Sequence, residues 1–259
     1  MRDQPIGIFD SGIGGLTVLQ NLIQQLPNES YIYIGDNKHC PYGDKPKEQL
    51  YKYACSIIDY FINHKVKLIV VACNTISSNV LPMLIDKYKD TKIIGIIEST
   101  TRLVLSSNTK KILVIATKAT ITSHIYKTSI NKSNPHLIVN ELMTPDLVPL
   151  IEKHLNDEII VSIHQYLKPF SHSFDSILLG CTHYGIIKDI IAREIGSKKI
   201  INSSDGIVNE VGEYLALNNL KGSKKKIQVY TTGDVQDFIS SSISFFDYKD
   251  INVQKLNLD

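Results

Sequence analysis

The stretch Leu68-Ile69-Val70-Val71-Ala72-Cys73-Asn74-Thr75 joins an uninterrupted apolar run to a cysteine and two polar residues. Such a run predicts a strand buried on both faces in a parallel sheet, and the helical pattern after it predicts a strand–helix unit. The stretch Ile177-Leu178-Leu179-Gly180-Cys181-Thr182-His183 repeats this pattern in the other half of the chain. Each thiol is therefore expected at the carboxyl end of a strand, where open α/β sheets bind their ligands.

Strand-like runs alternate with helical patterns along the whole chain, which predicts an α/β fold. The expected strands span residues 6–9, 31–34, 68–72, 92–97, 112–116, 137–140, 177–179 and 227–231. Aligning Cys73 on Cys181 superposes strand on strand and helix on helix, which suggests two similar lobes that face each other. Any two strand–helix units can resemble each other this closely, so the spacing alone leaves a duplication open.

Composition excludes several classes of protein. The chain has 259 residues, 43% of them hydrophobic, and can form one large domain or two modest ones. A net charge of +2 without a helix-turn-helix or zinc signature gives no reason to expect a nucleic-acid partner. The four cysteines form no CxxC pair, which argues against a disulfide framework or a zinc motif and favours reduced thiols. With no signal-peptide pattern and no membrane-spanning stretch in the sequence, we expect a cytoplasmic protein without membrane contact.

A glycine-rich turn, Asp10-Ser11-Gly12-Ile13-Gly14-Gly15, follows the first expected strand. A dinucleotide site is the obvious alternative, and Asp36 after the second strand is compatible with it. However, Thr17 stands where the third glycine or alanine should be, and Asp10 would place its charge beside the pyrophosphate. We therefore expect no nucleotide cofactor. The turn is expected to bring backbone amides to a small anionic ligand and Asp10 to a catalytic group.

The polar residues beside Cys73 and Cys181 distinguish these thiols from packed core cysteines. Asn74-Thr75 offers an amide and a hydroxyl, which suit an α-carboxylate or α-amino group. Thr182-His183 adds a hydroxyl and an imidazole that can pass protons or tune a thiol. The helix after each thiol is expected to lower its pKa. Two such thiols indicate an enzyme that uses them as an acid/base pair.

The other two cysteines lack such neighbours. Cys55 shares a helical face with Ile58 and Phe61 and is expected in the core. Cys40 is interpreted as a non-catalytic thiol beside the turn Pro41-Tyr42-Gly43, which is expected at the mouth of the cleft.

An ordered series of motifs then resembles the glutamate racemases of the cofactor-independent aspartate/glutamate racemase superfamily. The motifs are Phe9-Asp10-Ser11-Gly12-Ile13-Gly14-Gly15-Leu16, Pro41-Tyr42-Gly43, Ala72-Cys73-Asn74-Thr75, Ala116-Thr117-Lys118-Ala119-Thr120 with Ser123 and Tyr126, Val148-Pro149-Leu150-Ile151-Glu152, and Leu179-Gly180-Cys181-Thr182-His183-Tyr184. The resemblance runs from Ile6 to about Asp205. His183 favours glutamate over aspartate racemases, which usually have glutamate at that place.

The resemblance implies two three-layer α/β lobes with mostly parallel sheets around a central cleft. The first lobe would comprise residues 1–97 and 208–259 and carry Cys73, and the second, residues 98–207, would carry Cys181. The implied reaction interconverts L- and D-glutamate without pyridoxal phosphate, metal or nucleotide and supplies D-glutamate for peptidoglycan. The implied partner is this small-molecule substrate, and a homodimer stays open.

The resemblance also implies roles for individual residues. Cys73 would take the α-proton from D-glutamate with help from Asp10, and Cys181 would take it from L-glutamate with help from Glu152 and His183. The residues implied to bind the amino acid are Asp10, Ser11, Pro41, Tyr42, Gly43, Asn74, Thr75, Thr117, Thr120, Thr182 and His183. No metal ligands are implied.

Three alternatives remain at this point. The chain could be another racemase of the superfamily, acting on aspartate or a hydantoin. It could be a non-catalytic binding module, against which both thiols and their polar neighbours argue. It could be a hydrolase with one nucleophilic cysteine and a histidine, which would leave the second thiol unexplained.

Overall fold

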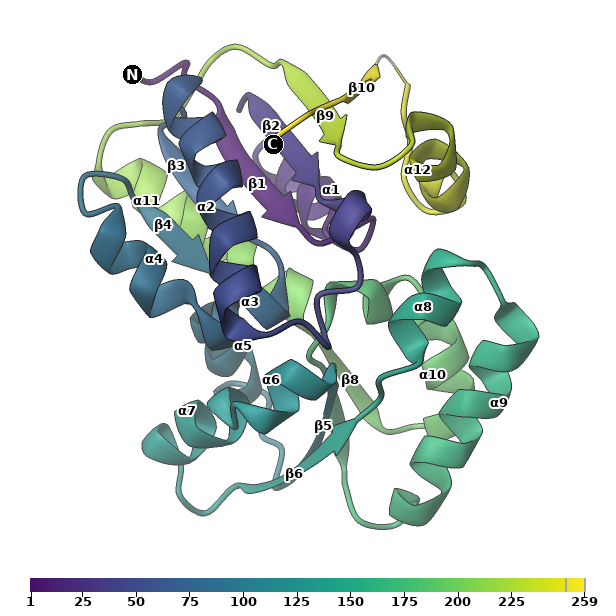
Figure 1. Ribbon diagram of the computed structural model, residues 1–259. Helices are drawn as coiled ribbons and strands as arrows, with labels where there is room; N and C mark the ends of the chain where they lie inside the picture. The colour runs from purple at the N-terminus through teal and green to yellow at the C-terminus, as the bar shows by residue number, and fades with distance from the viewer. Residues whose placement is uncertain (250, 259) are drawn as a thin grey trace.

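The computed structural model describes residues 1–249 and 251–258. Residues 250 and 259, which fall in the tail expected to join the first lobe, lie outside the described residues. Figure 1 shows two α/β lobes, with both ends of the chain on the same lobe. The predicted fold class, two lobes with parallel sheets, is confirmed.

Among the described residues, every pairing between strands is parallel. The first sheet has the order β10 (Val253–Lys255), β9 (Ile227–Thr231), β2 (Tyr31–Gly35), β1 (Ile6–Asp10), β3 (Leu68–Val71) and β4 (Ile93–Gly95). The second has the order β6 (Ile138–Met143), β5 (Lys111–Ala116), β7 (Ser176–Leu179) and β8 (Lys199–Asn202). The order β2-β1-β3-β4 thus recurs as β6-β5-β7-β8, so the two lobes share one topology and β7 is the counterpart of β3.

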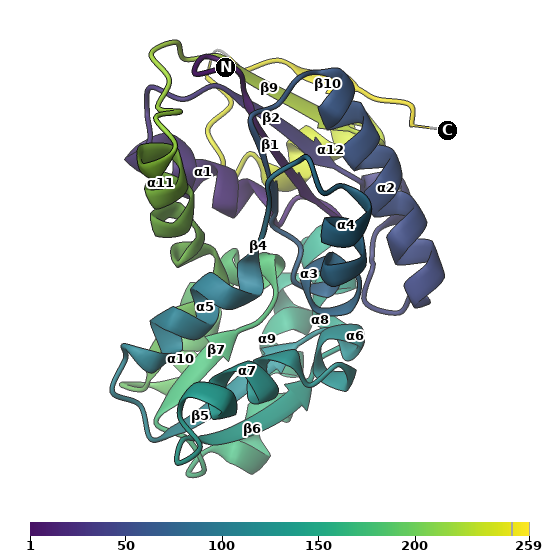
Figure 2. The same ribbon diagram turned by 90° about the vertical axis from the view of Figure 1, so that its left-hand side faces the viewer.

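Helices cover both faces of the first sheet (Figure 2). Alternate residues of β1 point to opposite sides, since Ile8 belongs to one core cluster and Phe9 to another. The helices on the Ile8 side are α1 (Leu16–Gln25), α11 (Ile207–Leu217) and α12 (Val235–Ser242). Those on the Phe9 side are α2 (Lys47–Asn63), α3 (Asn74–Asn79) and α4 (Leu81–Lys87).

The second sheet is covered in the same way. The helices on one face are α5 (Ile96–Leu105), α6 (Lys118–Thr122) and α7 (Ile125–Ser133). Those on the other are α8 (Leu147–Glu152), α9 (Asn156–Leu167) and α10 (Lys188–Ile195). Four short 3-10 helices complete the described elements: η1 (Asn37–His39), η2 (Lys168–Phe170), η3 (Thr182–Gly185) and η4 (Ser203–Asp205). None of the helices in the described ranges combines the length and the apolar character needed to span a bilayer.

The chain passes between the lobes twice, at neighbouring places. It leaves the first sheet through α5 and returns through η4, and these two segments are in contact. The hydroxyl of Thr100 in α5 donates a hydrogen bond to the carbonyl of Ser203 in η4 (3.2 Å). We propose lobe boundaries at residues 97 and 208, because the strands before and after this range belong to the first sheet.

Three details differ from the sequence-based expectation. The strands Lys199–Asn202 and Val253–Lys255 were not predicted, because the first has only two apolar residues between polar ends and the second exposes two of its three side chains. Ile96 and Ile97 begin α5 rather than extending a strand. A short apolar run cannot distinguish a buried helical turn from a strand.

Candidate active site

The two thiols occupy equivalent positions at the carboxyl ends of the sheets. Cys73 follows β3 and directly precedes α3, and Cys181 follows β7 and directly precedes η3. Both side chains are buried, and neither forms a disulfide. They line one narrow, nearly closed cavity between the lobes, with a volume of about 10 Å³.

The cavity collects most of the residues that the sequence singled out. Its lining consists of Ser11, Pro41, Tyr42, Gly43, Cys73, Asn74, Thr75, Thr117, Val148, Cys181, Thr182 and His183. Asp10, Glu152 and Thr120 do not line it and contact residues that do. Val148 was not predicted as a site residue, because an apolar side chain carries no chemical signal in a single sequence.

Asp10 is fully buried and holds the glycine-rich turn in place. Its carboxylate accepts hydrogen bonds from the backbone N–H groups of Gly12 (3.2 Å) and Gly15 (3.1 Å). It also accepts one from the hydroxyl of Thr182 (3.2 Å) in the other lobe. Burial raises the pKa of Asp10, although the His183 charge and these donors lower it in part.

The glycine-rich turn therefore differs in part from the expectation. The backbone N–H of Ile13 donates to Glu152 (3.3 Å), so the amides of residues 12, 13 and 15 all serve protein carboxylates. These three amides are therefore not free for a ligand, whereas Ser11 of the same turn lines the cavity, and the expected contact of the turn with a small anionic ligand stays a prediction. Asp36 was compatible with a nucleotide site, but its carboxylate is also hydrogen-bonded within the protein, because it accepts hydrogen bonds from Tyr42 and from Thr232 (2.6 Å).

The environment of Cys73 keeps its proton in place. Burial and the nearby charge of Asp10 raise the pKa of Cys73, while the backbone N–H of Ile76 and the hydroxyl of Ser11 lower it in part. The N–H of Ile76 belongs to the first turn of α3, so the expected helix contribution is present. In this closed cavity it is outweighed by desolvation.

Cys181 faces a chain of two further side chains. His183 Nδ1 lies 3.8 Å from Cys181 Sγ, and His183 Nε2 lies 2.6 Å from Glu152 Oε1. Burial alone would lower the pKa of His183, but contacts with Cys181, Cys40 and Glu152 raise it well above the usual value. Burial alone would raise the pKa of Glu152, yet His183 lowers it on balance. The pair is therefore an imidazolium and a carboxylate.

The helix expected immediately after Cys181 is only the four-residue 3-10 helix η3, and α10 begins at Lys188. A helix of this length offers little dipole at its start. The group placed to hold or deliver a proton at Cys181 is instead the imidazole of His183.

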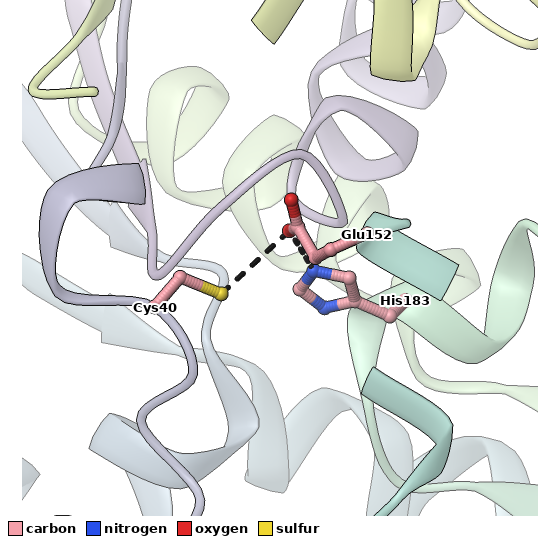
Figure 3. A group of neighbouring side chains, drawn as sticks. All are labelled: Cys40, Glu152 and His183. Atoms are coloured by element: carbon pink, nitrogen blue, oxygen red, sulfur yellow. Dashed lines mark hydrogen bonds and ion pairs between the residues drawn. The ribbon is translucent and has the colours of Figure 1, made fainter. Parts of the chain in front are cut away.

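Cys40, which was interpreted as a non-catalytic thiol, lies beside this pair. Its Sγ is 3.6 Å from Glu152 Oε1, and burial raises the pKa of Cys40 to about 12. Figure 3 shows the three side chains converging, with Cys40 from the first lobe and the other two from the second. Cys40 does not line the cavity with Cys73 and Cys181. No signal in the sequence indicated this contact, because it depends on how the lobes pack.

Hydroxyl and amide groups form the walls between the thiols. The hydroxyls of Thr75 and Thr117 lie 3.0 Å apart across the two lobes. Thr117 also caps α6 by accepting a hydrogen bond from the backbone N–H of Thr120 (3.4 Å), so Thr120 supports the wall from behind. The amide of Asn74 is fixed by Tyr126 and by Ser203 (3.2 Å). A polar cavity of this kind suits a small ligand with several polar groups.

Comparison with known proteins agrees with this arrangement. The family model for Asp/Glu/hydantoin racemases matches residues 6–211. The chain is 39% identical to glutamate racemase 2 of Caldanaerobacter subterraneus subsp. tengcongensis over 246 residues, which is 92% of this chain and 91% of the relative. It is also 39% identical to the glutamate racemase of Clostridium perfringens (strain SM101 / Type A) over 230 residues, which is 87% of this chain and 88% of the relative.

Solved structures show the same fold over the full length. The glutamate racemase isoform RacE1 from Bacillus anthracis matches with a TM-score of 0.91 at 30% identity and covers 100% of this chain and 99% of its own. The glutamate racemase from Francisella tularensis in complex with D-glutamate matches with a TM-score of 0.91 at 33% identity and the same coverage.

Proposed function

The chain belongs to the Asp/Glu/hydantoin racemase family, and from this premise we propose that it interconverts L- and D-glutamate with Cys73 and Cys181 as two bases. The observation that carries the proposal is that the two thiols come from different lobes and line one cavity. Because D-glutamate is a component of bacterial peptidoglycan, we propose cell-wall synthesis as the use of the product. The cytoplasmic location and a homodimer stay predictions.

Racemisation needs two proton-transfer groups on opposite sides of one carbon. In one direction the thiolate of Cys181 removes the α-proton of L-glutamate and becomes a thiol, while the thiol of Cys73 delivers its proton to the other face and becomes a thiolate. In the reverse direction the roles exchange. No proton is gained or lost over a turnover, so neither a redox step nor a second substrate is required.

The neighbouring residues divide the supporting tasks. His183, held by Glu152, is placed to move a proton at Cys181 Sγ. Asp10 is buried near Cys73, and it accepts a hydrogen bond from Thr182, which belongs to the other lobe. The hydroxyls and amides of the cavity wall would hold the amino acid and stabilise the charge that develops on the α-carbon and its carboxylate.

Circular dichroism of L-glutamate incubated with the pure protein and no added cofactor tests the reaction. We expect the signal to decay to zero as the enantiomers equilibrate. D-aspartate, followed in parallel, should racemise far more slowly. Equal rates on the two amino acids would contradict the assignment of glutamate.

Cysteine variants test the mechanism. Cys73→Ala and Cys181→Ala should each lose turnover in both directions while remaining folded, because each direction needs a base and an acid. Cys55→Ala removes a buried thiol from α2, away from the cavity, and should keep its turnover. Full activity in a folded Cys73→Ala or Cys181→Ala protein would refute the two-base mechanism.

A further inference from the structure

Cys40, Glu152 and His183 bring a sulfur, an oxygen and a nitrogen ligand atom within 4.8 Å of one another (Figure 3). No other trio of His, Cys, Asp and Glu ligand atoms converges this closely in the part of the chain that the structure describes. We propose that these three residues form a binding site for Zn²⁺, and that the bound ion fixes the two lobes together and inhibits the enzyme.

The donor set is one that zinc accepts. Thiolate, imidazole and carboxylate are its usual ligands, and three protein ligands with a water in the fourth place are a common arrangement. The cysteine spacing excluded a local zinc motif, but it says nothing about ligands from separate segments. Here Cys40 follows η1, Glu152 ends α8 and His183 lies in η3.

Two of the three distances between the ligand atoms can be compared with those around a tetrahedral ion, and the third, between Cys40 Sγ and His183 Nε2, is within 4.8 Å. Bond lengths of about 2.3 Å to sulfur and 2.1 Å to oxygen place these two ligand atoms about 3.6 Å apart. The distance from Cys40 Sγ to Glu152 Oε1 is 3.6 Å. The His183 and Glu152 atoms are hydrogen-bonded at 2.6 Å and would have to separate to about 3.4 Å.

The surroundings allow an ion to enter and keep the ligands aimed at it. The side chain of Glu152 is 19% exposed, so the site opens to solvent on that side. The amide of Asn37 lies 3.4 Å from the other oxygen of Glu152 and orients the carboxylate. A Cβ on Gly12 would lie 2.3 Å from Glu152 Oε1, 3.2 Å from Cys40 Sγ and 3.3 Å from His183 Nε2, so the three atoms converge over a residue without a side chain.

Binding would release two protons. The thiol of Cys40 loses its S–H proton and the imidazolium loses its Nε2 proton, while bonds from the ion to sulfur, nitrogen and oxygen form. His183 then no longer carries the proton that it shares with Glu152. Because Cys40 belongs to one lobe and the other two ligands to the second, the ion also holds the two lobes in a fixed relative position. Both effects lower the rate of racemisation.

Co²⁺ absorption tests the site without reference to activity, because a cobalt–thiolate bond gives an intense charge-transfer band. Wild-type protein titrated with Co²⁺ should develop the band, and so should Cys55→Ala and Cys181→Ala. Cys40→Ala and the closer mimic Cys40→Ser should lack it. A band that persists in both Cys40 variants, a band that is lost in Cys181→Ala, or no band in the wild type would overturn the proposal.

Inhibition by Zn²⁺ is the second readout, and it rests on the proposed racemase activity. Because Cys40 contacts the Glu152–His183 pair, inhibition of Cys40→Ala is measured relative to its own rate in the absence of Zn²⁺. The Zn²⁺ concentration for half-inhibition should rise at least about tenfold in this variant. Equal inhibition of wild type and Cys40→Ala would place the ion on the catalytic thiols instead. If the protein had no racemase activity, the Co²⁺ experiment would still decide whether the site exists.

Discussion

Replacing Gly14 by alanine should push the two lobes apart at His183. A Cβ at this position would lie 2.6 Å from His183 Nδ1, 2.7 Å from the His183 backbone nitrogen and 2.7 Å from Thr182 Oγ1. The backbone nitrogen cannot rotate away, and the imidazole is held by Glu152 at 2.6 Å. An ordinary contact begins at 3.4 Å, so η3 and the turn must separate by about 0.7 Å.

Both the free energy of unfolding and kcat of the Gly14→Ala variant should be lower than those of the wild type. Forcing an extra methyl group into a packed contact costs about 1–3 kcal/mol. The hydrogen bond from Thr182 to Asp10, now 3.2 Å long, crosses the same contact and would be lost. A shift of this order in the position of reacting groups can lower kcat by up to about 100-fold. We therefore expect a lower urea midpoint and a kcat reduced more than KM is raised.

Gly212→Ala is the matched control, assayed by the same urea titration and the same circular-dichroism rate. Gly212 lies within α11, and a Cβ there would meet only Leu26 Cδ2 at 3.8 Å, an ordinary contact. Alanine in a helix is favoured over glycine by about 0.5–1 kcal/mol, so this variant should be at least as stable as the wild type and as active. If Gly14→Ala matched the wild type in midpoint and rate, the described packing of the turn against η3 would be wrong.

Three further changes have expected outcomes. In heavy water, D-glutamate formed from L-glutamate should carry deuterium at Cα from the first turnovers, because the proton comes from the second thiol. If mass spectrometry found protium at Cα of the D-glutamate at low conversion, the two-base mechanism would be excluded. Glu152→Gln should cost about 1.5–3 kcal/mol of unfolding free energy. The pKa of Glu152 is lowered and that of His183 is raised, so the loss of unfolding free energy should be complete between pH 4.5 and 6.5. The loss should shrink as pH falls below 4.5, and it should disappear at high pH only when pH rises through the raised pKa of His183. A series of urea titrations that shows no pH dependence would contradict the ion pair. Lys67 is buried against Glu29 and donates hydrogen bonds to the carbonyls of Arg2 (2.7 Å) and Leu220 (2.9 Å). Lys67→Met should therefore lower the free energy of unfolding by about 3–5 kcal/mol, because Glu29 would keep a buried charge without its partner. An unchanged thermal midpoint would argue against this ion pair.

The sequence predicted those features that a short segment determines. A run of consecutive apolar residues identifies a strand that is buried on both faces inside a parallel sheet, and the residues that follow it lie at the carboxyl end of the strand. This reasoning placed Cys73 and Cys181 correctly relative to their strands. The recurrence of one strand order in both sheets agrees with the suggested similarity of the lobes.

Contacts that depend on packing between segments could not be predicted. The sequence around Cys40 is that of a turn, and its approach to Glu152 exists only because two lobes meet there. The glycine-rich turn has the composition of an anion-binding loop, but its own Asp10 takes two of its amides. The edge strand β10 exposes most of its side chains and therefore has no alternating pattern to read.

The order of the strands has a consequence for how the protein forms during synthesis. The strands of the second sheet all come from one continuous stretch, Lys111 to Asn202, whereas β2 of the first sheet pairs with β9, which begins at Ile227. A chain emerging from the ribosome can thus complete the second lobe while one edge of β2 is still unpaired. On nascent chains stalled shortly before β9, protease should cut the first lobe and spare the second. The first part of the chain to be made is then the last to be finished.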